Sequence, residues 1–399
     1  MLRDFFCQKV FPSVFCKDKR VIGGIDLEKP VKVLQIGMTD NIGGMETYLM
    51  AQYRKLNREL VRYDFLNITG ESQIVFSDEI ERNGDSIYGV PSRHKSPLGH
   101  YWGVLKLLYQ KRHEYKYIVL NTCSLNYVFP LFVAALVGIP HRVIHSHNSG
   151  DEIAESLPRK CLKCLNSFLL KLSATDYWAC SKLAGKWMFG QREFRIVHNA
   201  INVEKFVYNP VIRQEVRQEL GISNNFVIGN VARFSYQKNH EFLLDIFYEI
   251  TKYDKNAILL LIGSPNSNEK RFLMIKNKIK QYHLEEQVLF LGLRKDTERL
   301  YQAMDCLVMP SRFEGLSVVA VEAQAAGLPC VVSDRMTPET QITDKFYSLS
   351  LTISPHDWAT KILEVKALKR ENELLSIQSA GYDINVLSKS ITDFYTSNS

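Results

Sequence analysis

Two glutamates and the short loop before a helix are the residues of this chain best suited to chemistry. Glu314 falls in the loop, and Glu322 follows eight residues later within the expected helix. Gly315 would let backbone approach a ligand, and the free N–H groups of Leu316 and Ser317 would form an anion seat at the helix start. Two carboxylates beside an anion seat suit a ligand that carries hydroxyls and phosphates. A nucleotide sugar is such a ligand.

The elements around these glutamates are predicted to be a strand, a helix and a strand. Apolar residues at Cys306–Met309 and 330–332 indicate two buried strands, and the helix between them carries small alanines that permit close packing on a sheet. Gly327 ends that helix. Asp305, just before the first strand, is expected to be structural. An ordinary amphipathic helix with a glutamate on its wet face is the alternative explanation of this stretch.

The order of residues in this stretch resembles a known signature. Pro-Ser, Glu-Gly, Glu-Ala, Ala-Gly, Pro and Val-Val follow one another between residues 310 and 332. This order resembles the E-x7-E signature of the retaining family-four glycosyltransferases, and the longer stretch 291–334 is similar to the exopolysaccharide and capsule branch of that family. The resemblance implies an α/β protein of GT-B fold, in which two Rossmann-like parallel-sheet domains face each other across a cleft.

Two cations follow a further predicted strand, residues 226–231. Arg233 and Lys238 lie in the loop ARFSYQKNH, at the carboxyl end of that strand. Arginine by its fork and lysine as a point charge can hold a diphosphate, although surface cations in a loop are also common. Their spacing resembles the Arg-x4-Lys loop of the family. We therefore expect both to be catalytic, by stabilising the leaving phosphate.

Glycine and polar residues of the first half complete the predicted site. Gly43 and Gly44 precede a helix, and His147 follows the strand-like run RVIHS. The resemblance implies that the glycine pair borders the cleft, that His147 lies near the donor sugar, and that Asn199 belongs to the crossover between the domains. His145 shares a face with His147, but a structural role is the stronger expectation for it.

The resemblance also assigns roles within the second half. Glu314 is expected to bind sugar hydroxyls, Glu322 the ribose hydroxyls, and Arg294 the nucleotide base of a UDP-linked donor. Many members have glycine where this chain has Ser317, which would place a side chain beside the sugar. The chain has no D-x-D motif, so we expect no metal ion and no cofactor. Attack from the front face needs no carboxylate nucleophile, and none is assigned.

The charge distribution bears on the second substrate. Residues 1–200 hold 27 Lys and Arg against 19 Asp and Glu, while residues 201–399 hold 23 against 24. A basic first half suggests an anionic partner on that side. Residues 157–172 predict an amphipathic helix with four cations, Arg159, Lys160, Lys163 and Lys171. A lipid-linked saccharide acceptor is therefore expected. For this helix, packing against the sheet is the stronger expectation, and peripheral contact with the inner membrane leaflet is the alternative.

Length and composition limit the remaining possibilities. The 399 residues suit two domains, expected at 30–203 on the acceptor side and 204–380 on the nucleotide-sugar side. An extension, 1–29, precedes them, and a helix within 381–399 is expected to return to the first domain. No apolar run is long enough to span a bilayer, and charges interrupt any signal-peptide core, so a cytoplasmic location is expected. No zinc module or RNA-binding motif indicates a nucleic-acid partner.

Two rival functions remain open at this stage. A nucleotide-sugar 2-epimerase shares the two-domain fold and the donor, but it needs acid and base residues in motifs that this chain does not show. An inactive glycosyltransferase-like partner subunit is the other alternative. The presence of Arg233, Lys238, Glu314 and Glu322 argues against it.

Overall fold

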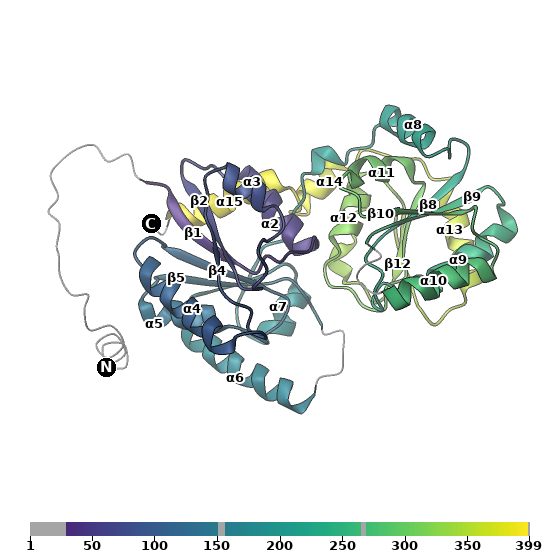
Figure 1. The fold of residues 1–399 in the computed structure, drawn as a ribbon. Coiled ribbons are helices and arrows are strands. Elements are labelled where there is room, and N and C mark those ends of the chain that lie inside the picture. The colour runs from purple at the N-terminus through teal and green to yellow at the C-terminus, as the bar shows by residue number, and fades with distance from the viewer. Residues whose placement is uncertain (1–28, 151–155, 265–268, 398–399) are drawn as a thin grey trace, which may run out of the picture.

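The computed structural model describes residues 29–150, 156–264 and 269–397, which form two parallel sheets within two α/β halves (Figure 1). The predicted extension 1–29 lies, apart from Lys29, outside the described residues. Both sheets have helices packed on them, so the predicted α/β class with two Rossmann-like units is confirmed. Among the described residues, no helix is both long and apolar enough to cross a membrane.

The first sheet has seven strands in the order β3-β2-β1-β4-β5-β6-β7, and every neighbouring pair is parallel. Its strands are β1 (Val31–Ile36), β2 (Val61–Asn67), β3 (Ile87–Gly89), β4 (Tyr117–Thr122), β5 (His141–Ser146), β6 (Asp176–Ala179) and β7 (Arg195–Ile196). The helices between them are α2 (Gly44–Lys55), α3 (Ser77–Arg82), α4 (Pro97–Lys111), α5 (Phe129–Val137), α6 (Leu157–Ser173) and α7 (Lys182–Phe189). Parallel strands covered on both faces are continuous apolar runs, as the sequence of β4 illustrates.

The second sheet has six parallel strands in the order β10-β9-β8-β11-β12-β13. Its strands are β8 (Phe226–Val231), β9 (Ala257–Ile262), β10 (Val288–Gly292), β11 (Cys306–Met309), β12 (Cys330–Ser333) and β13 (Phe346–Leu349). Its helices are α8 (Pro210–Glu219), α9 (His240–Tyr253), α10 (Glu269–Gln281), α11 (Thr297–Ala303), α12 (Val318–Ala325), α13 (Pro355–Val365) and α14 (Leu374–Ser379). All six residues of β9 are buried, which places this strand inside the sheet.

The last helix, α15 (Ile384–Ser397), packs on the first half although it follows the second in sequence (Figure 1). Its side chains Ile384, Ile391 and Tyr395 belong to the apolar core that α2 shares with β1 and β2. Residues Ile201 and Asp383 pair in a short parallel bridge where the chain returns. Helix α15 therefore packs on the core of the first half.

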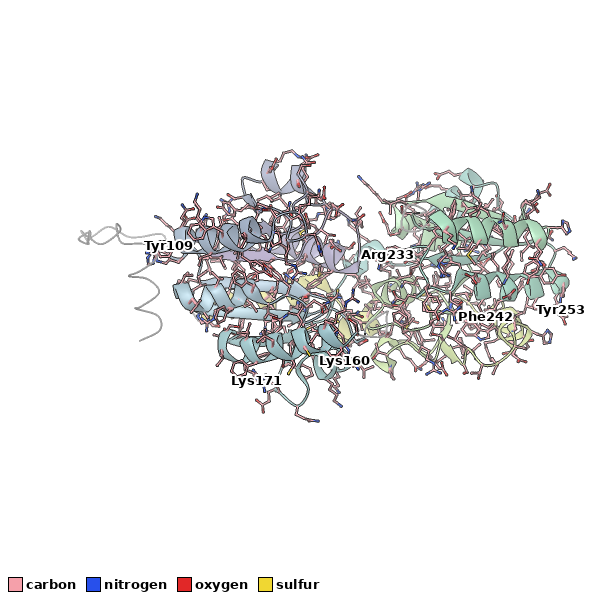
Figure 2. The ribbon with its side chains drawn as sticks, turned by 60° about the horizontal axis from the view of Figure 1, so that its bottom comes forward. Tyr109, Lys160, Lys171, Arg233, Phe242 and Tyr253 are labelled. Carbon is pink, nitrogen blue, oxygen red and sulfur yellow. The ribbon has the colours of Figure 1, made fainter. Side chains whose placement is uncertain are left out.

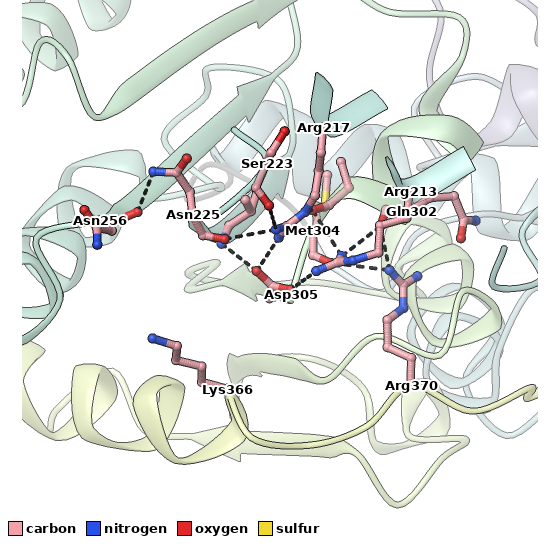
Figure 3. Close-up of polar contacts among 12 residues, drawn as sticks. Arg213, Arg217, Ser223, Asn225, Asn256, Gln302, Met304, Asp305, Lys366 and Arg370 are labelled. Carbon is pink, nitrogen blue, oxygen red and sulfur yellow. Dashed lines mark hydrogen bonds and ion pairs between the residues drawn. The ribbon is translucent and has the colours of Figure 1, made fainter. Parts of the chain in front are cut away.

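A cluster of arginines around Asp305 fixes the start of the central strand β11 (Figure 3). The Asp305 carboxylate accepts hydrogen bonds from Arg213, from Arg217 at 2.6 Å and from the Val227 N–H at 2.8 Å. Arg213 and Arg370 both donate to the carbonyl of Met304. Asp305 thus ties β8, α8 and β11 together, and the predicted structural role is confirmed.

Candidate active site

Loops from the two halves meet where their parallel strands end. Gly44 begins α2 after β1, and a Cβ atom built on it would lie 3.7 Å from Val318 Cγ2 in α12 of the second half. A Cβ on Gly315 would lie 2.9 Å from Ser149 Oγ, just beyond β5. Any larger residue at position 315 would press on Ser149. Gly315 thus lets the two loops approach closely, and the predicted Gly44 and Gly315 border the junction, with Gly43 next to Gly44 in the chain.

Glu314 and Lys238 form an ion pair at this junction. The Lys238 Nζ atom donates to Glu314 Oε1, and the two side chains are only 14% and 7% exposed. Gln237 reinforces the contact, because its amide donates to the Phe313 carbonyl at 3.0 Å. The loops after β8 and β11 are thus joined. A carboxylate and a cation are held side by side in a region largely closed to water.

Arg233 lies at the junction with its side chain exposed, as Figure 2 shows. Burial raises the pKa of the Cys123 thiol in the first half, whereas the Arg233 guanidinium opposes this rise. That interaction places Arg233 opposite the end of β4. The Arg233 guanidinium has no hydrogen bond or ion pair with any residue that the structure describes. Arg233 therefore differs from Lys238, which is paired with Glu314.

His147 is held by asparagines at the end of β5. Its Nδ1 atom lies 2.9 Å from Asn199 Oδ1, and its Nε2 atom lies 3.2 Å from Asn121 Oδ1. Burial lowers the pKa of His147 to about 4, so the ring is neutral at pH 7. His145, in contrast, is buried and contacts the Val197 carbonyl at 3.0 Å, which fits a structural role. The structure therefore brings His147 and Asn199 together as a positioned neutral group.

The helix that follows Gly315 begins later than the sequence indicated. Ser317 is the N-cap of α12, and its Oγ atom accepts from the Ala320 N–H at 3.4 Å. Ser317 is buried and its side chain satisfies the helix end, and its predicted place beside the donor sugar stays a prediction. Leu316 is also buried. The first helical residue is Val318, so unpaired N–H groups of the first turn extend the predicted anion seat beyond Leu316 and Ser317.

Glu322 is buried in α12 rather than exposed on a wet face. Its Oε2 atom accepts a hydrogen bond from the Tyr301 hydroxyl at 2.9 Å. Burial raises the pKa of Glu322 to about 7, and the Tyr301 hydrogen bond opposes this rise. Arg294, also predicted to bind the donor, forms a bidentate ion pair with Asp296 at 2.7 and 2.6 Å. Glu322 and Arg294, both predicted to bind the donor, are thus bonded to other residues of the protein in this structure.

Replacing Glu322 with glutamine should change how stability depends on pH. The folded protein keeps Glu322 protonated up to about pH 7, whereas the unfolded chain ionises it near 4.5. The native state therefore binds more protons in this window, so this residue makes stability fall as pH rises. We expect Glu322→Gln to gain about 3 kcal/mol relative to the parent between pH 4.5 and pH 7.5.

Chemical unfolding at several pH values measures this difference. The exposed Glu285→Gln serves as the matched control and should follow the parent at every pH. Parallel curves for Glu322→Gln and the parent would show that the carboxyl is ionised throughout.

Four residues of the junction escaped the sequence analysis. Gln237, Ser149, Asn121 and Tyr301 each contact a predicted site residue or its loop. Gln237 and Ser149 lie in polar loops that follow strands, which is a signal that sequence reasoning could have used. Asn121 lies near the polar end of β4 and carries a similar signal, whereas Tyr301 lies within helix α11 and carries none. Among the residues that the structure describes, no group of three His, Cys, Asp or Glu side chains could hold a metal ion.

The chain is similar in sequence to known glycosyltransferases. A family model described as "Glycosyl transferases group 1" matches residues 212–381. A putative glycosyltransferase, EpsF, of Bacillus subtilis (strain 168) is 32% identical over 364 residues, which cover 88% of this chain and 93% of that protein. An amylovoran biosynthesis glycosyltransferase, AmsD, of Erwinia amylovora is 37% identical over 112 residues, which cover 28% of this chain and 30% of that protein.

Two further similarities concern ligands. A UDP-Gal:alpha-D-GlcNAc-diphosphoundecaprenol alpha-1,3-galactosyltransferase of Escherichia coli is 28% identical over 246 residues, or 57% of this chain and 60% of that protein. The crystal structure of Anabaena HepE in complex with UDP has a TM-score of 0.75 and 21% identity, and covers 92% of this chain and 100% of that one. At this identity the structural likeness shows the fold alone.

Proposed function

Because the chain belongs to the group 1 glycosyl transferases, we propose that it moves a hexose from a UDP-linked donor to a lipid-linked saccharide, with retention of configuration, in exopolysaccharide or capsule synthesis. The Lys238–Glu314 ion pair at the junction is the observation that carries this proposal. It presents a cation for phosphate and a carboxylate for sugar hydroxyls at one place. The polysaccharide relatives and the UDP-linked galactosyltransferase support the choice of substrates.

The proposed reaction exchanges one bond at the anomeric carbon. The bond to the diphosphate breaks, the bond to the acceptor oxygen forms on the same face, and the acceptor proton passes to the leaving phosphate. Arg233 and Lys238, with the N–H groups before α12, stabilise the negative charge that grows on that phosphate. Glu314 orients the sugar and Glu322 binds the ribose hydroxyls. Glu314 is already paired with Lys238, so it is not assigned as a nucleophile.

The proposal assigns each half a role. Residues 30–203 would form the acceptor domain and residues 204–380 the donor domain, with the segment 381–399 returning to the first. His147, held neutral by burial, would lie near the donor sugar without adding a charge there. Gly43 and Gly44 would let the sugar approach the α2 backbone, and Arg294 would leave Asp296 to reach the base. Peripheral attachment to the inner leaflet would give access to the lipid-linked acceptor.

Incubation of the full chain with a panel of nucleotide sugars and a lipid-linked saccharide tests the function. Glycosyl transfer releases nucleoside diphosphate and forms the α-linked product from an α-linked donor. An epimerised donor would instead indicate the 2-epimerase. If no nucleotide sugar is altered, the result supports the hypothesis of an inactive glycosyltransferase-like partner subunit.

Transfer should also survive EDTA, because the proposed positive field comes from side chains and helix N–H groups. The measurement is the rate of nucleoside diphosphate release before and after chelation, with an expected change of less than about twofold. If EDTA abolishes activity and added magnesium restores it, Arg233 and Lys238 do not take the place of a metal ion.

A further inference from the structure

Helix α6 turns an apolar face away from the protein. Leu157, Leu165, Phe168 and Leu172, together the α6 apolar face, are between 55% and 74% exposed. At 100° per residue they fall within one 80° arc of the helix. These large apolar side chains therefore lie together on the outer surface of the protein. A surface helix normally carries polar residues on the side that faces water.

The opposite face of α6 holds the helix against the first half. Asn166, Leu170 and Ser173 are its buried residues. The Asn166 amide donates to the Leu125 carbonyl at 2.7 Å, and Leu170 belongs to the core beneath α4 and α5. The expected packing of α6 thus uses this narrow face and leaves the α6 apolar face exposed.

Charge on α6 favours an anionic partner for its apolar face. The described helix contains four cations and no carboxylate, although Asp151, Glu152 and Glu155 precede it in the sequence. Lys160 and Lys171 are both exposed and lie along one border of the α6 apolar face. A second copy of the chain packed on this face would place these lysines close to those of its partner. A surface that combines acyl chains and anionic headgroups matches both features.

The position of α6 links this surface to the proposed site. The segment after β5 carries Ser149, which faces Gly315, and α6 begins eight residues later. Figure 2 shows Lys160 near the junction of the two halves and Lys171 farther from it. A membrane against α6 would therefore lie beside the junction where the acceptor must enter.

We propose that the α6 apolar face inserts into the surface of a membrane leaflet rich in anionic lipid, with Lys160 and Lys171 against the headgroups. This inference deepens the proposed function and rests on it, because only a lipid-linked acceptor requires such an attachment. The helix lies in the plane of the interface, as amphipathic helices with a basic border do. The junction then opens toward the acceptor headgroups.

Vesicle flotation of the full chain tests the apolar part of this proposal. The protein should float with vesicles of phosphatidylglycerol and phosphatidylcholine. Leu165→Gln, Phe168→Gln and Leu172→Gln combined should reduce the bound fraction by about tenfold or more. These side chains are exposed, so the variant should fold as the parent does, which circular dichroism verifies. Equal flotation of the variant and the parent would overturn the proposal.

A matched triple variant controls for loss of surface apolarity in general. Leu273→Gln, Leu375→Gln and Val386→Gln replace residues that are equally exposed on other helices, and this variant should float as the parent does. Reversal of charge by Lys160→Glu and Lys171→Glu should weaken binding about tenfold and reduce its salt dependence. Equal binding to pure phosphatidylcholine vesicles would contradict the anionic specificity.

Two further measurements separate this inference from the proposed function. Transfer to a water-soluble acceptor analogue should be unchanged in the α6 triple variant, whereas transfer to an acceptor in vesicles should fall. If the protein floats with vesicles but has no transferase activity, the membrane proposal holds and the proposed function is contradicted. The parent could instead fail to float and sediment as a dimer that the triple variant abolishes. That result would identify a second copy of the chain as the occupant of the α6 apolar face and overturn the membrane proposal.

Discussion

Replacing Lys238 with methionine is expected to lower turnover by about 10²- to 10³-fold, the cost of losing one charge-stabilising group at a reacting centre. Arg233→Ala should cost about 10²-fold for the same reason. Arg233 is exposed, so its removal should leave folding intact and act on the rate alone. Lys238 is largely buried beside Glu314, so its removal should affect stability as well. Steady-state kinetics with saturating donor measure both effects.

Lys252→Ala is the matched control for these substitutions. It removes a cation from the same domain, where Lys252 pairs with Glu249 on the surface of α9. Its turnover should equal that of the parent. If Arg233→Ala also kept full turnover, the leaving phosphate would not be stabilised by this loop, and the proposed assignment of the diphosphate would be abandoned.

The parallel sheets could be predicted because their strands are uniform apolar runs that end at polar or glycine residues. The sequence predicts strands at 226–231, 288–292 and 306–309 and a helix at 240–253, and β8, β10, β11 and α9 have these bounds. The sequence predicts a helix over residues 101–113, but α4 begins four residues earlier, at Pro97, because proline is well suited to the first turn of a helix. The short elements α3 and β13 were not recognised. Elements of four to six residues carry too little periodicity to stand out from the loops around them.

The site could be predicted as a set of residues but not as a set of contacts. Lys238 and Glu314 are 76 residues apart in the chain, and His147 and Asn199 are 52 apart. Local patterns placed each residue at a strand end, but no local pattern indicates which side chains meet. The burial of Glu322 against Tyr301 depends on how α11 packs beside α12. Such facts come from tertiary packing, which a single sequence does not display.

Helix α6 shows the same limit of prediction from a single sequence. The sequence indicated an amphipathic helix with cations, but amphipathicity alone does not say which face meets the protein. The structure resolves this because Asn166 and Leu170 point inward while Phe168 and Leu172 are exposed. An apolar face that packing leaves uncovered needs a partner, and the lysines beside it limit which partners fit.

Glu314→Gln is expected to lower turnover by about 10²-fold or more and to destabilise the protein by about 3 kcal/mol. The stability loss arises because Lys238, only 14% exposed, would keep its charge without a carboxylate to balance it. Binding of the free nucleoside diphosphate should change little, since Glu314 is assigned to the sugar. Kinetics, chemical unfolding and calorimetry with UDP measure the three effects, and the exposed Glu285→Gln controls for loss of a carboxylate.

The double variant Lys238→Met with Glu314→Gln separates the two roles of this pair. With both charges removed, no buried ion lacks a partner, so most of the lost stability should return. Turnover should not return, because the phosphate would still lack its cation and the sugar its carboxylate. Recovery of stability without recovery of turnover is thus the signature of a pair that serves catalysis. If turnover recovered along with stability, the Lys238–Glu314 pair would be a structural ion pair, and the carboxylate that orients the sugar would have to be sought elsewhere at the junction.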